Sequence, residues 1–184
     1  MGKMQNSLTL CVITLLLLSC RDDFTVDPEP DPTNGSAILL NSSFELGGSP
    51  TLQGWDASNE QQTTFLQDTP PDGGEWCLSI SSTPGPAAFI EALFPASSGT
   101  RGYKISVWGK YLRTQGTISI IQRSLNNTTI RSSLSVQDTV WTAYVLIDTL
   151  TTASGDSVGV RLSGGITEIS TGTVAYDICL FERL

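Results

Sequence analysis

From residue 38 to its end, the chain alternates short apolar runs with clusters of turn-forming residues. Aromatic and β-branched residues fill the runs, as strands favour, and Gly, Pro, Asn, Asp and Ser fill the gaps. This alternation is typical of an all-β sandwich or barrel with many short strands. The chain has 17 glycines and 9 prolines, which fits this interpretation. One domain accounts for the length, and residues 37–184 are predicted to form it.

The strand predictions follow from the apolar runs and the turn clusters between them. The expected strands are Ile38–Glu45, Thr63–Phe65, Cys77–Ser82, Ala87–Phe94, Tyr103–Leu112, Gly116–Arg123, Thr128–Val136, Val140–Thr149, Ser157–Ser163 and Val174–Phe181. The run Ala87–Phe94 resembles a helix in composition. Because it is short and lies between Pro86 and Pro95, we predict a strand.

Two simple counts exclude several classes of function. The chain contains no histidine, so it cannot by itself form a Ser-His-Asp or Cys-His catalytic group, a histidine zinc site or a histidine pH switch. Its 10 Lys and Arg against 18 Asp and Glu leave a formal net charge of -8. This charge argues against nucleic-acid binding, which needs clustered basic residues.

The first twenty residues have the pattern of a bacterial export signal. Lys3 precedes an apolar run that is too short to span a bilayer and suits the h-region of a signal peptide. The run ends in Leu17-Leu18-Ser19-Cys20, which resembles a lipobox, the site where signal peptidase cuts before a lipid-modified cysteine. We therefore expect residues 1–19 to be removed and Cys20 to carry a membrane anchor. The alternative is a plain signal peptide with an accidental cysteine.

Residues 20–36 are predicted to be an acidic, Pro-rich tether with little to bury. Asp22 and Asp23 directly follow the cysteine and resemble the signal by which some Gram-negative bacteria export lipoproteins to the outer face of the outer membrane. A surface-exposed outer membrane lipoprotein is the corresponding expectation, with a periplasmic location as the alternative. In the simpler interpretation, the acids only keep the tether soluble.

Six segments of the domain occur in a recognisable order. They are NSSFE at 41–45, GW at 54–55, GEWCLSI at 74–80, YKISVWGK at 103–110, VWT at 140–142 and YDICL at 176–180. In this order they resemble carbohydrate-binding module family 4/9, over nearly the whole domain. The resemblance implies a galactose-binding-like jelly roll of two antiparallel sheets. Ser42 and Tyr176 depart from the family pattern, which has glycine and aspartate at these places.

The resemblance also implies a structural calcium ion. The matching acids of the family are Glu45 and Asp177, helped by backbone carbonyls near Gly74 and Glu75. Calcium takes six to eight oxygen ligands, so carbonyls and water would complete the set. In the alternative, turn amides or solvent satisfy the two acids.

The four tryptophans divide into three groups. Trp55 and Trp141 match family positions that pack in the interior, and Trp76 is expected near the calcium corner. Trp108 is different, because strand alternation puts it on the face opposite to Ile105 and Val107. It shares that face with polar residues, and aromatic rings stack on sugars. The predicted ligand-binding residues are Trp108, Lys110, Gln122, Arg123 and Arg131. Their donors suit sugar hydroxyls or the carboxylate of an acidic sugar.

Cys77 and Cys179 are the two cysteines of the domain. Export from the reducing cytosol permits a disulfide between them. Buried free thiols are the alternative, and the sequence does not decide between the two. Without histidine to activate it, neither thiol is expected to be a nucleophile.

The leading hypothesis is a membrane-anchored, non-catalytic lipoprotein that captures an oligo- or polysaccharide. The second hypothesis is a structural or accessory lipoprotein whose sandwich binds a protein partner in an envelope complex. A small glycosidase needs only two carboxylates and no histidine. The acids of this domain are scattered, which argues against that third hypothesis.

Overall fold

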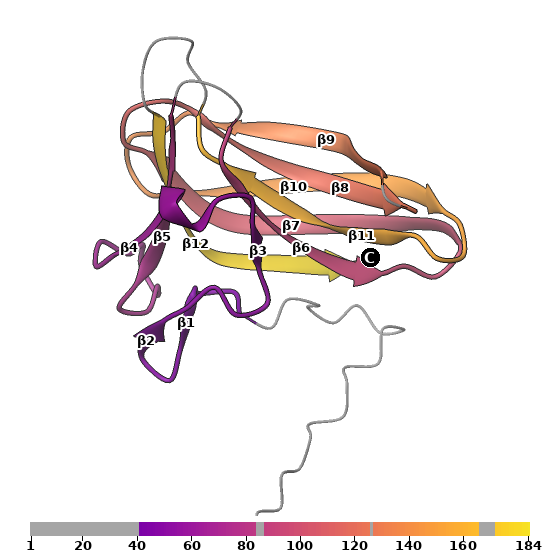
Figure 1. Cartoon of the computed structure of the whole chain (residues 1–184), viewed down its shortest axis with the longest axis horizontal. Helices are drawn as coiled ribbons and strands as arrows, with labels where there is room; N and C mark the ends of the chain where they lie inside the picture. Colours follow the sequence, from indigo (N-terminus) through magenta and orange to yellow (C-terminus); the bar gives the residue numbers. More distant parts are fainter. Residues whose placement is uncertain (1–40, 84–86, 126, 166–171) are drawn as a thin grey trace, which may run out of the picture.

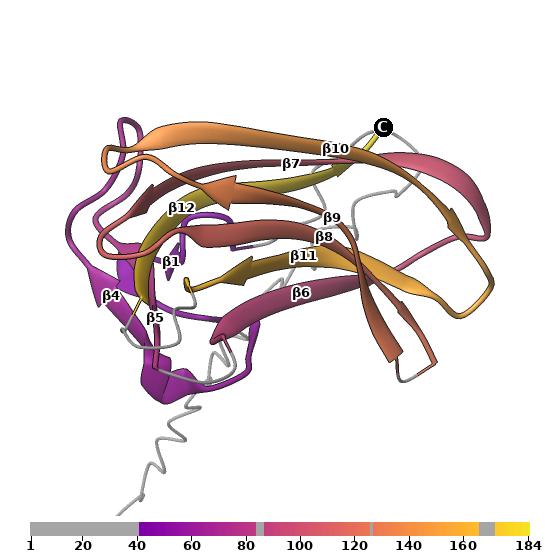
Figure 2. The ribbon, with the colours of Figure 1, turned by 90° about the horizontal axis from the view of Figure 1, so that it is seen from above.

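A computed structural model describes residues 41–83, 87–125, 127–165 and 172–184. These residues form two antiparallel sheets of five strands each and one two-stranded ribbon. Figure 1 shows one sheet in front of the other, and Figure 2 shows the two layers from above. The all-β jelly-roll sandwich predicted from the sequence is confirmed. No helix in the described part of the chain is long and apolar enough to cross a membrane.

The back sheet has the strand order β10-β7-β12-β5-β4. Its strands are β10 (Thr142–Thr152), β7 (Gly99–Tyr111), β12 (Gly172–Arg183), β5 (Cys77–Ser82) and β4 (Thr63–Leu66). The front sheet has the order β3-β6-β11-β8-β9. Its strands are β3 (Asp56–Ala57), β6 (Phe89–Pro95), β11 (Ser157–Ser163), β8 (Gly116–Ser124) and β9 (Asn127–Val136). The ribbon pairs β1 (Glu45–Leu46) with β2 (Ser49–Pro50), and a 3-10 turn, η1, covers Glu60–Gln62.

The core lies between the two sheets and follows from strand alternation. In β7, Ile105 and Val107 are buried, whereas Trp108 points to the other face, as the sequence predicts. Aromatic rings connect the layers: the Phe181 ring of the back sheet lies 5.9 Å from the Phe94 ring of the front sheet, between centroids. Among the described residues, those of the core fall between positions 44 and 181. A chain of residues 36–184 therefore contains every core residue that the structure describes.

Most strand predictions agree with the structure. β5 and β11 have the predicted bounds, and the segment between the two prolines is a strand, β6, rather than a helix. β7 begins four residues earlier than predicted, at Gly99 instead of Tyr103, and β10 begins at Thr142 instead of Val140. The short elements β2, β3 and η1 were not predicted, because two or three residues carry no periodic pattern.

The prediction of one long strand over Ile38–Glu45 is wrong for most of the residues that the structure describes, because among them Glu45 alone is in a strand, β1. Residues 38–40 lie outside them, and residues 41–44 are not in a strand. Phe44 adopts a left-handed backbone with φ of 56°, which breaks an extended run. Its ring packs against Trp55 at 5.2 Å between centroids. The left-handed backbone and the fully buried ring occur together at Phe44.

Cys77 and Cys179 are buried free thiols in the structure. They do not form the disulfide that the sequence permits. Burial raises the pKa of the Cys77 thiol to about 11, and the negative charge of Asp177 adds to this effect. Burial also raises the pKa of Cys179. Neither group is a reactive thiolate near neutral pH.

We expect residues 36–184 to resist iodoacetamide at pH 8 while folded, because both thiols are buried and protonated. After denaturation in urea without reductant, mass spectrometry should show both cysteines alkylated. If alkylation after denaturation requires a reductant first, the cysteines form a disulfide and the assignment of free thiols is wrong.

Candidate functional site

An open groove of about 710 Å³ lies on the outer face of the front sheet. This volume is within the range of ligand sites in proteins. The groove is lined by Ser and Thr hydroxyls, the Gln115 amide and the Arg161 guanidinium, together with the larger apolar side chains of Phe89 and Ile130. The lining residues are Ala87, Phe89, Thr114, Gln115, Gly116, Thr117, Ser119, Ile130, Ser135, Arg161, Ser163 and Gly164.

Strand register arranges these side chains in rows across the sheet. The first row runs through Phe89, Ser163, Thr117 and Ser135 on β6, β11, β8 and β9. The second row runs through Glu91, Arg161, Ser119 and Ser133 on the same strands. The rows exist because alternate residues of each strand point into the core. In β11, for example, Val160 and Leu162 are fully buried between the sheets, so Arg161 and Ser163 must face outward.

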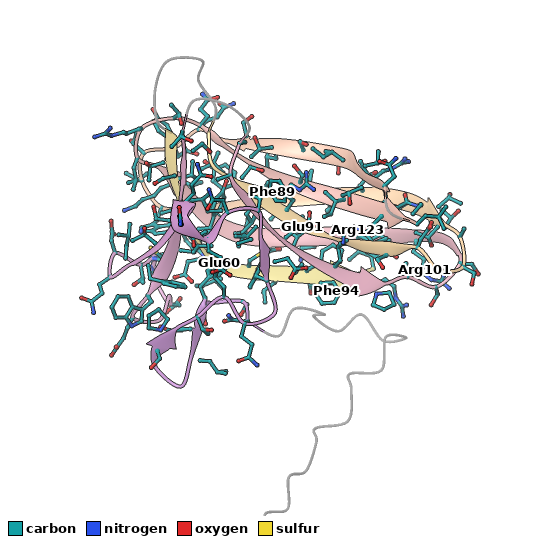
Figure 3. All side chains as sticks on the ribbon, viewed as in Figure 1. Glu60, Phe89, Glu91, Phe94, Arg101 and Arg123 are labelled. Atoms are coloured by element: carbon teal, nitrogen blue, oxygen red, sulfur yellow. The ribbon has the colours of Figure 1, made fainter. Side chains whose placement is uncertain are left out.

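A buried carboxylate organises the middle of this face. The Glu91 side chain is only 7% exposed, and both of its oxygens accept hydrogen bonds from arginine. Arg161 donates from Nε and Nη2 to Glu91 Oε2, at 3.1 and 2.7 Å, and Arg123 donates from Nη2 to Glu91 Oε1. A buried charge is tolerated when it is paired and hydrogen-bonded in this way. Figure 3 shows Phe89, Glu91 and Arg123 along the front sheet.

Arg161 is held from a second side by Phe89. The guanidinium carbon of Arg161 lies 3.9 Å from the centroid of the Phe89 ring. Stacking of this kind orients a planar guanidinium. In the same row, the hydroxyls of Ser119 and Ser133 lie 3.1 Å apart and form a hydrogen bond. The groove therefore offers fixed donors and acceptors at regular strand spacing, which suits a ligand with many hydroxyl groups.

The five predicted ligand-binding residues do not form one site. Trp108 and Lys110 lie on the outer face of the back sheet, whereas Gln122, Arg123 and Arg131 belong to the front sheet. Of the five, Arg123 takes part in the Glu91 cluster. Gln122 donates to Asp156 Oδ2 at 2.8 Å and so has a structural partner. Arg131 is exposed on β9.

Lys110 and Trp141 form a separate cluster with Asp68. Lys110 is nearly buried; it forms an ion pair with Asp68, and its ammonium nitrogen lies 5.0 Å from the centroid of the Trp141 ring. The hydrogen bond from Lys110 holds the pKa of Asp68 below its usual value. Trp141 is half-buried and outside the core, so the predicted interior position is wrong for this tryptophan. Trp55 is in the core as predicted.

The predicted metal-binding residues lie close together. Glu45 Oε2 accepts hydrogen bonds from the backbone N–H groups of Glu75 and Trp76, at 2.9 and 3.1 Å. Glycine leaves the space for this carboxylate, since a Cβ on Gly74 would lie 1.5 Å from Glu45 Oε1. Trp76 is therefore at this corner, as expected from the sequence.

Asp177 completes the same corner. Its Oδ2 is buried without a hydrogen-bond partner and lies 2.6 Å from where a Cβ on the neighbouring Gly73 would be. Burial raises the pKa of Asp177 to about 7, and the Glu45 charge contributes. The described residues contain no group of three or more Asp, Glu, Cys or His side chains that could hold a metal ion. A cation here would need backbone or water oxygens beside the two carboxylates, and calcium accepts such ligands.

Sequence reasoning missed Phe89, Glu91, Arg161 and the hydroxyl rows. For Arg161 a signal was present, because alternation in Ser157–Ser163 places it opposite to three apolar residues. No such signal marked Phe89, since apolar residues occupy both faces of β6. Which strands are neighbours decides whether these side chains meet, and the sequence alone does not reveal that order.

Solved structures of other proteins have a similar fold. The domain CBM22-1, a xylan-binding domain from Paenibacillus barcinonensis Xyn10C, superposes with a TM-score of 0.56 at 16% identity. The match covers 81% of this chain and 95% of that domain. A family 4 carbohydrate-binding module matches with a TM-score of 0.50 at 14% identity, over 84% of this chain and all of the module. The chain has the fold of carbohydrate-binding modules.

The same fold also occurs as part of a longer protein. The enzymatically active domain of tailspike protein 4 from bacteriophage CBA120 matches with a TM-score of 0.56 at 18% identity. The match covers 84% of this chain but only 22% of that one, so this chain spans about a fifth of it. No protein-family model and no curated protein sequence matches this chain. The expected likeness to carbohydrate-binding modules is confirmed at the level of fold.

Proposed function

We propose that this chain is a non-catalytic carbohydrate-binding protein and that the groove on its front sheet binds an oligo- or polysaccharide. The observation that carries the proposal is the groove itself, with its ordered rows of hydroxyls, Arg161 and Phe89. Sugars are bound by such polar groups together with aromatic surface. The fold shared with solved carbohydrate-binding modules supports the same function.

The acidic residues near the groove are not arranged for glycoside hydrolysis. A glycosidase needs two carboxyl groups flanking the bond that it cleaves, one of them able to donate a proton. No Asp or Glu is among the described residues that line the groove. Glu91 lies beside it, but both of its oxygens are engaged by arginine. Glu91 is therefore a poor proton donor or nucleophile.

One observation favours the second candidate, a protein-binding sandwich. Val145 and Ile147 are 52% and 58% exposed on β10, at the edge of the back sheet. They lie across from Ser106 and Lys104 on the same outer face. This apolar strip is small, whereas the front groove combines polar side chains with an aromatic ring, so glycan binding is the better supported function.

The proposal includes attachment to a membrane. Residues 1–40, which contain the lipobox-like segment and Cys20, lie outside the described residues. The sequence pattern supports lipidation of Cys20 and an acidic tether that leads to the sandwich. Export to the outer face of the outer membrane, supported by Asp22 and Asp23, would present the groove to external glycans.

The proposal also includes a structural calcium ion. Glu45 and Asp177 would hold it, with carbonyl oxygens near Gly74 and Glu75 completing the ligands. The unpartnered buried oxygen of Asp177 and the space left by the two glycines support this assignment. The ion would neutralise two neighbouring carboxylates and connect the β1 region to β12.

Binding to the groove is tested by affinity electrophoresis of residues 36–184 in gels that contain single polysaccharides. We expect retardation by at least one polysaccharide and loss of at least tenfold in affinity in Phe89→Ala, because that change removes aromatic surface and frees Arg161. Trp108→Ala, on the back sheet, is the matched control and should bind normally.

If Trp108→Ala abolishes binding and Phe89→Ala does not, the site lies on the back sheet. No binding across a broad glycan array would sink the function and favour a protein partner.

Lipidation is tested in a Gram-negative host that expresses the full chain. Metabolic labelling with a palmitate analogue should mark the protein, and it should fractionate with membranes. Cys20→Ser should lose both properties, since no thiol remains for modification. Labelling that persists in Cys20→Ser contradicts the assignment.

Calcium binding is tested by thermal unfolding of residues 36–184. We expect Tm to be higher with calcium than with a chelator, because a ligand that binds only the folded state adds about 2.7 kcal/mol at a hundred times its Kd. Asp177→Asn should remain folded and lose the calcium response. Asp148→Asn, which makes the same substitution on β10, is the control and should keep the calcium response. Equal Tm values for the unmodified protein in calcium and chelator would contradict the proposal.

A further inference from the structure

We propose that the front groove selects glycans that carry carboxylate groups, such as chains with uronic acid residues, and that Arg161 recognises the carboxylate. The inference rests on the proposed function and adds a ligand class to it. Its starting point is the charge of the groove. Arg161 is the one charged residue among the described residues that line it, in a chain with a net charge of -8.

The Glu91 carboxylate does not cancel Arg161 as a recognition group. Each Glu91 oxygen already accepts a hydrogen bond from a guanidinium, and the side chain is 7% exposed. A ligand therefore meets the donors of this cluster rather than its acceptors. Two arginines share the single carboxylate, so the three groups together carry one positive charge.

Arg161 retains donors for a ligand. A guanidinium has five N–H donors, and Glu91 is its hydrogen-bond partner among the described residues, through Nε and Nη2. The Arg161 side chain is 18% exposed and is held against the Phe89 ring at 3.9 Å. A guanidinium that is oriented before binding forms strong paired hydrogen bonds with a carboxylate.

Asp56 is a further charged residue near the cluster, and it is not among the residues that line the groove. Asp56 on β3 is opposite Glu91, on the side of β6 away from Arg161. It is exposed, so water and salt screen its charge. On the groove side of Arg161, the next residue in the row is Ser119, followed by Ser133. Ser119 itself is almost fully buried, but the Thr117 and Ser163 side chains of the first row are half-buried and line the groove. A carboxylated sugar at Arg161 would find these two hydroxyl groups for its own hydroxyls.

The test compares each acidic polysaccharide with its own carboxyl-reduced form, which keeps every linkage and replaces the carboxylate by a hydroxymethyl group. The probes are polygalacturonate, alginate and glucuronoxylan, measured by affinity electrophoresis or calorimetry with residues 36–184. We expect at least one acidic form to bind about tenfold or more tightly than its reduced form. The preference should fall as NaCl rises from about 50 mM to about 500 mM.

Variants separate recognition by Arg161 from general charge. Arg161→Gln should lose the preference, so that the acidic and the carboxyl-reduced forms of each polysaccharide bind with the same affinity within about threefold. Arg101→Gln is the control, because it removes a positive charge from an exposed position in β7. This variant should retain the preference for the acidic form. Circular dichroism checks that both variants are folded, and Arg161→Lys, which keeps the charge but not the planar fork, should recover only part of the preference.

The outcomes distinguish the two proposals. If neutral glycans bind and no acidic form is preferred, the inference is wrong and the proposed function stands. If acidic forms are preferred equally by Arg161→Gln and the unmodified protein, recognition lies elsewhere, and the inference is also overturned. If no polysaccharide of either kind binds, the proposed function itself fails.

Discussion

The packing of two sheets against each other is the constraint on which the rest of this structure depends. Each strand gives one face to the core, and a shift of register by one residue would exchange its buried and exposed side chains. Burial of residues such as Ile105, Val160 and Leu162 therefore determines which residues face outward. The rows of the front groove are a direct consequence, because they consist of the residues that the core excludes.

The Glu91 cluster shows how the outer face acquires fixed chemistry. A carboxylate that is nearly buried on β6 needs partners, and the register places Arg161 directly opposite it on β11. Arg123 reaches the same carboxylate from β8. The pairing satisfies the buried charge and at the same time orients Arg161 over Phe89. Stability of the face and preorganisation of its donors thus arise from the same contacts.

Elsewhere in the sandwich, glycines arrange two carboxylates. Because Gly73 and Gly74 have no side chains, the Asp177 and Glu45 carboxylates occupy the space beside them. The two acids lie close enough for the Glu45 charge to act on Asp177. The arrangement raises the pKa of Asp177 because burial and a like charge both disfavour ionisation. A cation would reverse that effect. Here the order of segments in the sequence indicated the neighbours correctly, since the resemblance to a known family supplied spatial information that residue types lack.

Strand alternation and turn residues by themselves determined the all-β class, most strand positions and the outward direction of Trp108. They failed at Phe44, which combines a buried ring with a left-handed backbone. The family resemblance failed at Trp141, which pairs with Asp68 and Lys110 outside the core. Only the tertiary structure decided which outward residues meet. It separated Trp108 and Lys110 from Arg123 and joined Arg123 to Glu91 and Arg161. The physical reason is that alternation is a local property of one strand, whereas a binding face is assembled from strands far apart in the chain.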